Sequence, residues 1–210
     1  MWCCLVGSEM CIRDSFIEVY ENVISPQTCK NLITLFEVNK DRQAKGVTSG
    51  GENPEHKQDT EITIDYSFFG QKDWGPNLQE VISGLGTSLS EYKNKYSSQH
   101  GVEYAGINAI DPWSLEKKFN FQRFLPGEGY KVWHCESPNV KYSQRVLVWM
   151  LYLNDVTDKG GTEFLHQDVT LQAKGGTIVI WPPWWTHYHK SQVSPTQVKY
   201  IMTGWMEYDS

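Results

Sequence analysis

Residues 144–181 read QRVLVWMLYLNDVTDKGGTEFLHQDVTLQAKGGTIVIW. The stretch contains four runs rich in β-branched and aromatic residues, separated by Asn-Asp and Gly-Gly pairs. Short runs of this composition, bounded by turn residues, are typical of antiparallel β-strands. The four expected strands are 144–153, 162–166, 168–172 and 176–181.

The same pattern continues on both sides of this stretch. We expect two further strands before it, at 118–124 and 129–135, and two after it, at 185–190 and 198–207. Eight short strands in succession predict a jelly roll or a small barrel.

The N-terminal half of the chain has the periodicity of helices instead. Ser25 and Pro26 place an N-cap and a first-turn proline before an amphipathic stretch that ends near Val38. A second helix is expected over 76–99. The polar, Gly-rich residues 40–57 are expected to form a long loop, and long loops in compact domains are usually lids or disordered segments. The predicted fold is therefore mainly β with flanking helices (α+β).

Composition and charge exclude some classes of function. The chain has 210 residues, of which 40% are hydrophobic, and its 19 basic and 25 acidic side chains give a net charge of -6. Proteins that bind nucleic acid by neutralising phosphates are usually basic, so we expect no nucleic-acid partner. The longest apolar run, Val146 to Leu153, is too short to span a bilayer, and we expect no membrane association.

Three of the five cysteines lie in the first eleven residues, and no Cys-x-x-Cys pair is present. A reducing compartment is therefore expected, and we place the protein in the cytoplasm. The opening MWCCLVGSEMCIRDS lacks the features of a signal peptide and resembles an adapter-derived translation product. Residues 1–15 are therefore left out of the functional interpretation, and 16–210 are expected to form one domain.

Two motifs could bind a metal. In GYKVWHCES (129–137), His134 and Glu136 are two residues apart, so in a strand both side chains leave the same face. PPWWTHYHKS (182–191) adds His187 and His189. Two histidines and a carboxylate form the facial triad of non-haem Fe(II) oxygenases. A three-histidine zinc or copper site, or a polar surface pair, would also fit this spacing.

Lys199 follows His189 by ten residues, in the strand-like segment TQVKYIMTGWM. A lysine on the inner face of an apolar strand is costly unless it is paired. A bound dicarboxylate such as 2-oxoglutarate would pair it, although the side chain could also extend to solvent.

Together these segments resemble the 2-oxoglutarate/Fe(II) dioxygenases, specifically the prolyl 4-hydroxylase-like branch. The resemblance runs from Phe16 to about Trp205 and is carried by FIEVYENVISPQTC, FLPGEGYKVWHCE, RVLVWMLYLNDV, GGTEFL, KGGTIVIWP, and H-x9-K followed by GWM. It implies a double-stranded β-helix (jelly roll) core. It also implies Fe(II) and 2-oxoglutarate as cofactors, O2 as co-substrate and ascorbate as a stimulant, with succinate and CO2 as by-products.

The resemblance implies that His134, Glu136 and His189 are the iron ligands and so the catalytic centre. His189 is preferred to His187 because the family places its carboxylate-binding base about ten residues after the distal histidine, and this base is Lys199 here. Glu136 departs from the family pattern, in which the carboxylate ligand is usually Asp.

Further co-substrate residues are implied by position. Tyr152 matches a tyrosine that commonly hydrogen-bonds 2-oxoglutarate, and Trp205 matches an aromatic residue close to the metal. Phe124 occupies a place where the family often has Tyr, which removes one hydroxyl contact.

The family also implies the substrate, a prolyl residue in a peptide or protein. The long Gly-rich loop 40–57 is placed where a lid over an extended peptide could form. An oxygenase acting on a free amino acid or small molecule is an alternative. A non-catalytic, Trp-rich jelly-roll module that binds carbohydrate, and a cupin-like isomerase or hydrolase without 2-oxoglutarate, are two others.

Overall fold

A computed structural model describes residues 15–48, 50–97 and 106–209. Its centre is a large antiparallel sheet in the order β1-β11-β8-β13-β6-β4-β2, and β5 pairs with β13. The strands of this sheet are β1 (Glu18–Tyr20), β2 (Ala44–Lys45), β4 (Thr60–Asp65), β5 (Trp113–Leu115), β6 (Lys118–Phe124), β8 (Arg145–Tyr152), β11 (Thr177–Trp181) and β13 (Lys199–Tyr208).

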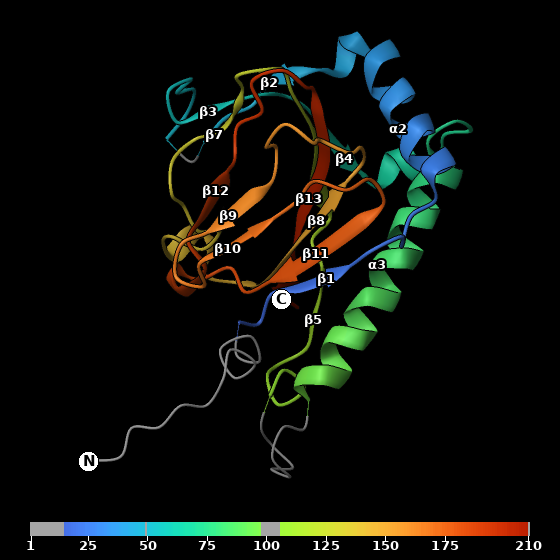
Figure 1. Cartoon of the computed structure of the whole chain (residues 1–210). Helices are drawn as coiled ribbons and strands as arrows, with labels where there is room; N and C mark the ends of the chain where they lie inside the picture. Colours follow the sequence, from blue (N-terminus) through green and yellow to red (C-terminus); the bar gives the residue numbers. More distant parts are fainter. Residues whose placement is uncertain (1–14, 49, 98–105, 210) are drawn as a thin grey trace.

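Two smaller sheets complete the barrel. Their strands are β9 (Thr162–Phe164), β10 (Val169–Leu171) and β12 (His189–Ser191) in one, and β3 (Lys57–Gln58) and β7 (Gly129–Tyr130) in the other. Figure 1 shows β9, β10 and β12 facing the large sheet across the interior. This arrangement confirms the predicted jelly-roll core with flanking helices.

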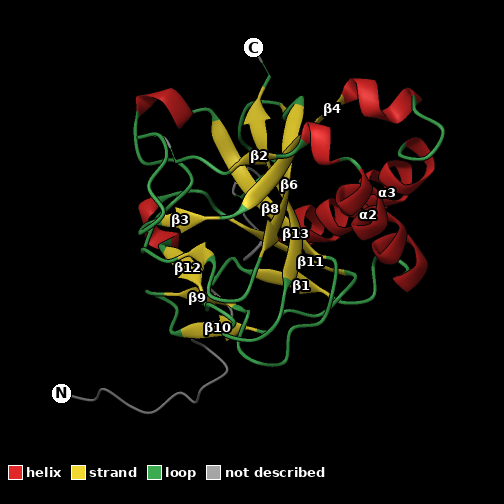
Figure 2. Cartoon of the chain, turned by 90° about the horizontal axis from the view of Figure 1, so that it is seen from above, coloured by secondary structure: helices red, strands yellow, loops and turns green. Residues whose placement is uncertain are grey.

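Two α-helices cover the outer face of the large sheet (Figures 1 and 2). They are α2 (Pro26–Val38) and α3 (Gly75–Tyr96), and short 3-10 helices follow at η1 (Lys40–Arg42), η2 (Tyr66–Gly70), η4 (Val140–Tyr142) and η5 (Trp185–His187). The Ser25 side chain accepts a hydrogen bond from the Thr28 N–H and so caps α2, as the sequence predicts. None of the described helices is long and apolar enough to cross a membrane.

Strand β8 is buried on both faces, which explains its unbroken apolar sequence. Leu147, Trp149 and Leu151 pack in the core beneath the helices. Val148, Met150 and Tyr152 alternate with them and belong to a second core inside the barrel. The large sheet therefore separates a structural core from the interior that holds the candidate site.

The structure corrects several sequence-based boundaries. Of the strand expected at 129–135, only Gly129–Tyr130 is a strand, and the chain then continues to an isolated bridge at His134. The strand expected at 185–190 is a 3-10 helix up to His187, and the strand itself is His189–Ser191. Pro182 and Pro183 have no N–H to donate to a ladder, so the chain turns after them before pairing again.

The sequence analysis did not predict β4, which lies next to the edge strand β2 in the large sheet. Its sequence, TEITID, alternates between polar and apolar residues, and Ile62 and Ile64 are buried. Loop 40–57 is also more ordered than expected, because it includes η1, β2 and the first residue of β3. Residues 1–14 lie outside the described part of the chain. The interpretation of residues 1–15 as non-native, and of 16–210 as one domain, therefore remains a prediction.

Candidate metal and co-substrate site

The two candidate histidine ligands are brought together by a single β-bridge. The His134 N–H donates to the His189 carbonyl at 3.0 Å, and the His189 N–H donates back at 2.8 Å. Their rings lie 4.3 Å apart between centroids. Glu136 follows on the same segment, which is fixed by its own N–H donating to the Pro183 carbonyl at 2.9 Å. Residues far apart in the sequence therefore meet at one place in the barrel.

His134, Glu136 and His189 together form a possible metal-binding group. One ligand atom from each lies within 4.8 Å of the others. Glu136 Oε1 is 3.4 Å from Nε2 of both histidines. Among the described residues this is the one group of three or more potential ligands that converges in this way.

The Nδ1 atoms of both histidines face backbone carbonyls, and these contacts determine that Nε2 is the ring nitrogen able to bind a cation. His134 Nδ1 lies 3.0 Å from the Val132 carbonyl, and His189 Nδ1 lies 2.9 Å from the His187 carbonyl. A carbonyl can only accept, so each Nδ1 carries the proton and each Nε2 keeps its lone pair. Three lone pairs then face one another, and this arrangement fits a divalent cation held by two imidazoles and one carboxylate.

The charge states agree with this assignment. Burial and the neighbouring His189 lower the pKa of His134, which keeps its imidazole neutral near pH 7. Burial alone would raise the pKa of Glu136, but hydrogen bonds and charge attraction from His134 and His189 in their protonated forms hold it well below its usual value, so the carboxyl is ionised. Neutral histidine and ionised glutamate are the forms that bind a metal.

The second oxygen of Glu136 is held away from the histidines. Trp205 Nε1 donates to Oε2 at 3.0 Å, and Arg145 Nη1 lies 3.4 Å from the same atom. Arg145 also donates to the Glu136 carbonyl at 2.8 Å. Its guanidinium stacks over the Trp205 ring at 3.7 Å, with Tyr142 at 4.5 Å. Trp205 thus lies beside the candidate metal site, with its indole hydrogen-bonded to the carboxylate of Glu136.

Arg145 was missed by the sequence analysis. The signal in the sequence was an arginine at the start of the apolar run of β8. In the structure this side chain is only 8% exposed. A buried guanidinium needs a partner. The sequence does not show that this partner is Glu136.

His187 has a different role from His189. Its Nε2 lies 2.8 Å from the Ser15 carbonyl, and its Nδ1 lies 2.9 Å from the Thr186 hydroxyl. Both ring nitrogens are therefore engaged away from the triad, and the His187 carbonyl orients His189 instead. This geometry supports His189 as the distal ligand.

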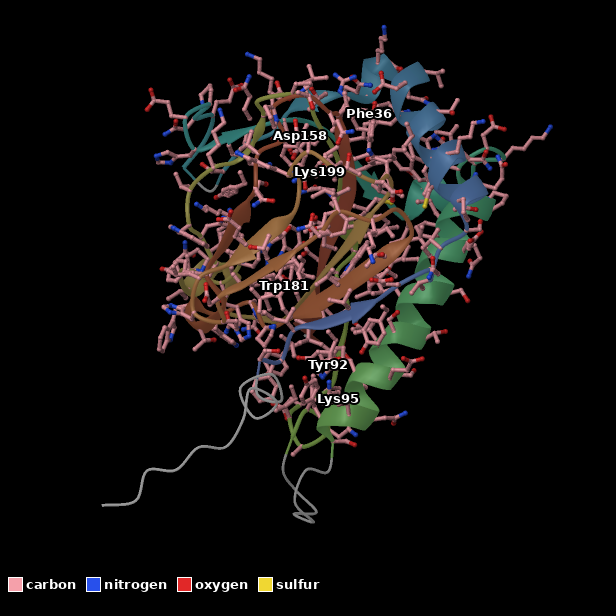
Figure 3. All side chains as sticks on the ribbon, viewed as in Figure 1. Phe36, Tyr92, Lys95, Asp158, Trp181 and Lys199 are labelled. Carbon is pink, nitrogen blue, oxygen red and sulfur yellow. The ribbon has the colours of Figure 1, made fainter. Side chains whose placement is uncertain are left out.

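A cavity of about 360 Å³ extends from the triad into the barrel. Lys199 lies on its wall and is only 4% exposed. Figure 3 labels Lys199 among the side chains of the barrel. None of the described residues places a carboxylate within salt-bridge distance of Lys199 Nζ. Its neighbours are the Ser191 hydroxyl at 3.5 Å and the Phe124 ring at 4.9 Å. Burial lowers the pKa of Lys199 to about 8. A buried ammonium without an anionic partner fits the carboxylate of a bound dicarboxylate.

Tyr152 occupies a less direct position. Its side chain is fully buried, and its hydroxyl shares a 2.7 Å hydrogen bond with Thr162 Oγ1. Thr162 lines the cavity, whereas Tyr152 is not among the lining residues. Direct contact between Tyr152 and 2-oxoglutarate therefore remains a prediction, and the observed hydrogen bond places Thr162 between Tyr152 and the cavity.

The expected lid segment reaches the same cavity. Val47 and Thr48 line it, as does Lys57 at the base of the segment. Lys57 Nζ donates to the Val47 carbonyl at 3.3 Å and to Glu61 at 3.0 Å. The base of this segment is thus tied to β4, on the wall of the cavity.

Comparison with known proteins agrees with this geometry. Residues 119–207 match the model of the 2OG-Fe(II) oxygenase superfamily. A PKHD-type hydroxylase from Synechococcus sp. (strain CC9902) is 29% identical over 85 residues, which cover 39% of this chain and 37% of that protein. The chain thus matches little more than a third of this relative's length.

Solved structures of prolyl hydroxylases share the fold. The viral collagen prolyl hydroxylase of Paramecium bursaria Chlorella virus-1, in complex with 2-oxoglutarate, has a TM-score of 0.64 and 14% identity over 93% of this chain and 98% of that one. The Trichoplax adhaerens enzyme, in complex with a hypoxia-inducible-factor peptide fragment, has a TM-score of 0.67 and 13% identity over 93% and 85%. A Pseudomonas putida prolyl-4-hydroxylase has a TM-score of 0.65 and 14% identity over 95% and 96%. Residues 119–207 therefore match the 2OG-Fe(II) oxygenase superfamily, and the chain has the fold of the prolyl 4-hydroxylases.

Proposed function

We propose that this protein is a 2-oxoglutarate- and Fe(II)-dependent dioxygenase that hydroxylates a prolyl residue in a peptide or protein. The observation that carries the proposal is the pairing of two sites in one cavity. His134, Glu136 and His189 converge at one place, and the unpaired ammonium of Lys199 lies on the wall of the same cavity. A metal-dependent isomerase or hydrolase would use the triad but would leave Lys199 without a partner.

Each residue has a defined task in this reaction. When bound, Fe(II) together with 2-oxoglutarate and O2 supplies the oxidising power needed to hydroxylate an unactivated C–H bond. The two histidines and Glu136 hold the metal on one side and leave its other positions free. Lys199 orients the co-substrate through its distal carboxylate. The apolar side chains of Met150, Trp181 and Ile201 line the cavity and limit the access of water.

A peptide substrate is supported by two observations. The prolyl hydroxylases that share the fold include one solved with a bound peptide fragment. Val47 and Thr48 of the expected lid also line the cavity, next to the wall formed by β4 and β6. A proline-rich segment in polyproline II conformation has little conformational entropy left to lose on binding beneath such a lid.

The test combines a binding measurement with a product measurement. Anaerobic addition of Fe(II) and 2-oxoglutarate is expected to give a weak visible charge-transfer band. Incubation in air with ascorbate and a library of proline-containing peptides is then expected to yield succinate and peptides heavier by one oxygen atom, detected by mass spectrometry. Succinate formation driven only by free amino acids would refute the peptide substrate, and absence of the band would refute the oxygenase.

A further inference from the structure

The cavity has a second polar wall, to which the proposed function gives no task. The side chains that form it are Lys57, Glu61, Asn120 and Gln122. Glu61 on β4 pairs directly with Gln122 on β6 in the register of the large sheet, and both side chains line the cavity. The Glu61 side chain is 12% exposed. A carboxylate therefore borders the space that extends from the triad into the barrel.

The charges of this wall do not balance. Lys57 Nζ donates to Glu61 Oε2 at 3.0 Å and lies 3.4 Å from Asp59 Oδ2. Its remaining contact is the neutral carbonyl of Val47 at 3.3 Å. Among the described residues, no other cationic side chain lies within salt-bridge distance of either carboxylate. The lysine–carboxylate cluster of Lys57, Asp59 and Glu61 thus carries one excess negative charge when both carboxyls are ionised.

Asp59 shows that positive charge is missing from the cluster. Its side chain is fully buried, Gln122 Nε2 donates to Oδ2 at 2.7 Å, and none of the described residues donates to Oδ1. Burial, with a smaller contribution from Glu61, raises the pKa of Asp59 to about 6 against the opposing effect of Lys57. A buried carboxylate is costly when too little positive charge lies nearby. A second cation beside the cluster would therefore be stabilised.

The backbone of the expected lid segment closes one side of the cluster. A Cβ on Gly46 would overlap Asp59 Oδ1, so glycine is needed where the chain passes this carboxylate. The Gly46 N–H also donates to the Asp59 carbonyl at 3.1 Å. The open side is Glu61 Oε1, to which none of the described residues donates a hydrogen bond. A cation could reach the cluster there, from the cavity.

The other cations that line the cavity have different partners. Arg145 lies beside Glu136, and Lys190 pairs with Glu163 at 3.1 Å. The lysine of β13 is assigned to the co-substrate. The missing positive charge therefore fits a ligand that enters the cavity, and the cations that a peptide carries are lysine and arginine side chains. Such a pair with Glu61 is stronger in a cavity shielded from bulk water than on the surface.

We infer that Glu61, with Asp59 behind it, selects a peptide substrate that carries a lysine or arginine close to the prolyl target. The inference rests on the proposed function and narrows its substrate class. It makes Glu61 a specificity-determining residue, and it gives Lys57 the task of holding one Glu61 oxygen while the other faces the peptide.

The test measures peptide binding without turnover. The protein is loaded anaerobically with Mn(II) and 2-oxoglutarate, and fluorescence anisotropy gives the affinities of labelled peptides that contain one proline. Each position on either side of the proline is occupied in turn by lysine, by norleucine, which has a similar length and no charge, or by glutamate. At one or two positions lysine should bind about 10-fold more tightly than norleucine, and glutamate should bind most weakly.

Two variants assign this preference to a residue. Glu61→Gln keeps the size of the side chain and should abolish the preference for lysine, while the norleucine peptide should bind as it does to the wild type. Glu21→Gln is the matched control, because Glu21 also pairs with a single lysine, Lys174 at 2.8 Å, but is exposed and does not line the cavity. It should keep the full preference. Both variants should bind 2-oxoglutarate as the wild type does, which checks that the barrel is intact.

The outcomes separate this inference from the proposed function. If the wild type binds lysine and norleucine peptides equally at every position, the cationic subsite is refuted while the peptide hydroxylase stands. A lysine preference that survives in Glu61→Gln would refute the role of Glu61. Equal weakening of all peptides by this substitution would also refute it, because Glu61 would then act through the fold. If the wild type binds none of the peptides, the proposed peptide substrate fails together with the inference.

Discussion

Trp205 Nε1 donates a hydrogen bond to Glu136 Oε2 at 3.0 Å, so the indole holds one oxygen of the carboxylate while the other faces both histidines. A glutamate side chain has one more rotatable bond than aspartate and could otherwise adopt several positions. With the far oxygen fixed in this way, Oε1 is the carboxylate atom that would hold a metal together with the two histidines.

Replacing the indole tests this relationship. Trp205→Phe keeps an aromatic ring but removes the donor, and it should weaken metal binding about 10-fold or more. Calorimetric titration with Mn(II) or Co(II) gives the affinity. Trp185→Phe is the matched control, because Trp185 is 65% exposed and should bind metal as the wild type does. Equal affinities for the Trp205 variant and the control would contradict a positioning role.

Arg145 should act on the metal through Glu136. Arg145→Met removes the donor beside Oε2 and should lower Co(II) affinity by about 10-fold. In a Glu136→Asp background the shorter side chain no longer brings its far oxygen to the guanidinium. The same Arg145 substitution should then cost less, which gives a measurable coupling energy in a double-mutant cycle. Additive effects would show that Arg145 supports the site only through its contact with the Glu136 carbonyl or through packing.

His187 and His189 should behave in opposite ways. His189→Ala removes a ligand and should abolish metal binding and Fe(II)-dependent turnover. His187→Ala should keep most of the turnover but lose about 1 kcal/mol of stability, because the partly buried Ser15 carbonyl and Thr186 hydroxyl lose their partner. Metal titration and thermal unfolding of both variants provide the comparison. If His187→Ala abolished metal binding and His189→Ala kept it, His187 and not His189 would be the distal ligand.

Binding of 2-oxoglutarate should depend on pH through Lys199. Because burial lowers the pKa of Lys199 to about 8, the free protein loses this ammonium as the pH rises through that value. The affinity for 2-oxoglutarate should therefore fall above about pH 8, toward a tenfold loss per pH unit. The affinity for 2-oxopentanoate, a 2-oxo acid that lacks the distal carboxylate, should show no such fall. Lys199→Arg keeps its charge and should abolish the dependence.

Removing the charge altogether gives an independent check. Lys199→Ala should raise the Kd for 2-oxoglutarate by on the order of 100-fold, since a buried carboxylate loses its charged partner. Affinity for Mn(II) alone should change little. An unchanged Kd would remove Lys199 from the co-substrate site.

Local sequence patterns were sufficient to predict much of this fold. The cap at Ser25 and strand β6 lie where the sequence predicts them, because capping and short-range periodicity depend on near neighbours. The candidate ligand set could also be named from the sequence, since His134 and Glu136 are two positions apart and the spacing from His189 to Lys199 matches a family pattern. The strand expected at 185–190 was placed wrongly, because the chain leaves the large sheet at two prolines and pairs again, with β9 of another sheet, only from His189.

Only the tertiary structure shows which residues far apart in the sequence come into contact. The bridge between His134 and His189 joins segments 55 positions apart, so nothing in either segment reveals that their rings meet. The contacts of Arg145 with Glu136 and of Ser191 with Lys199 depend on the same closure of the barrel. Sequence by itself determined which chemical groups this protein carries. The pairing of distant strands decided which of them share a cavity, because the free energy of those contacts arises only when the whole barrel is formed.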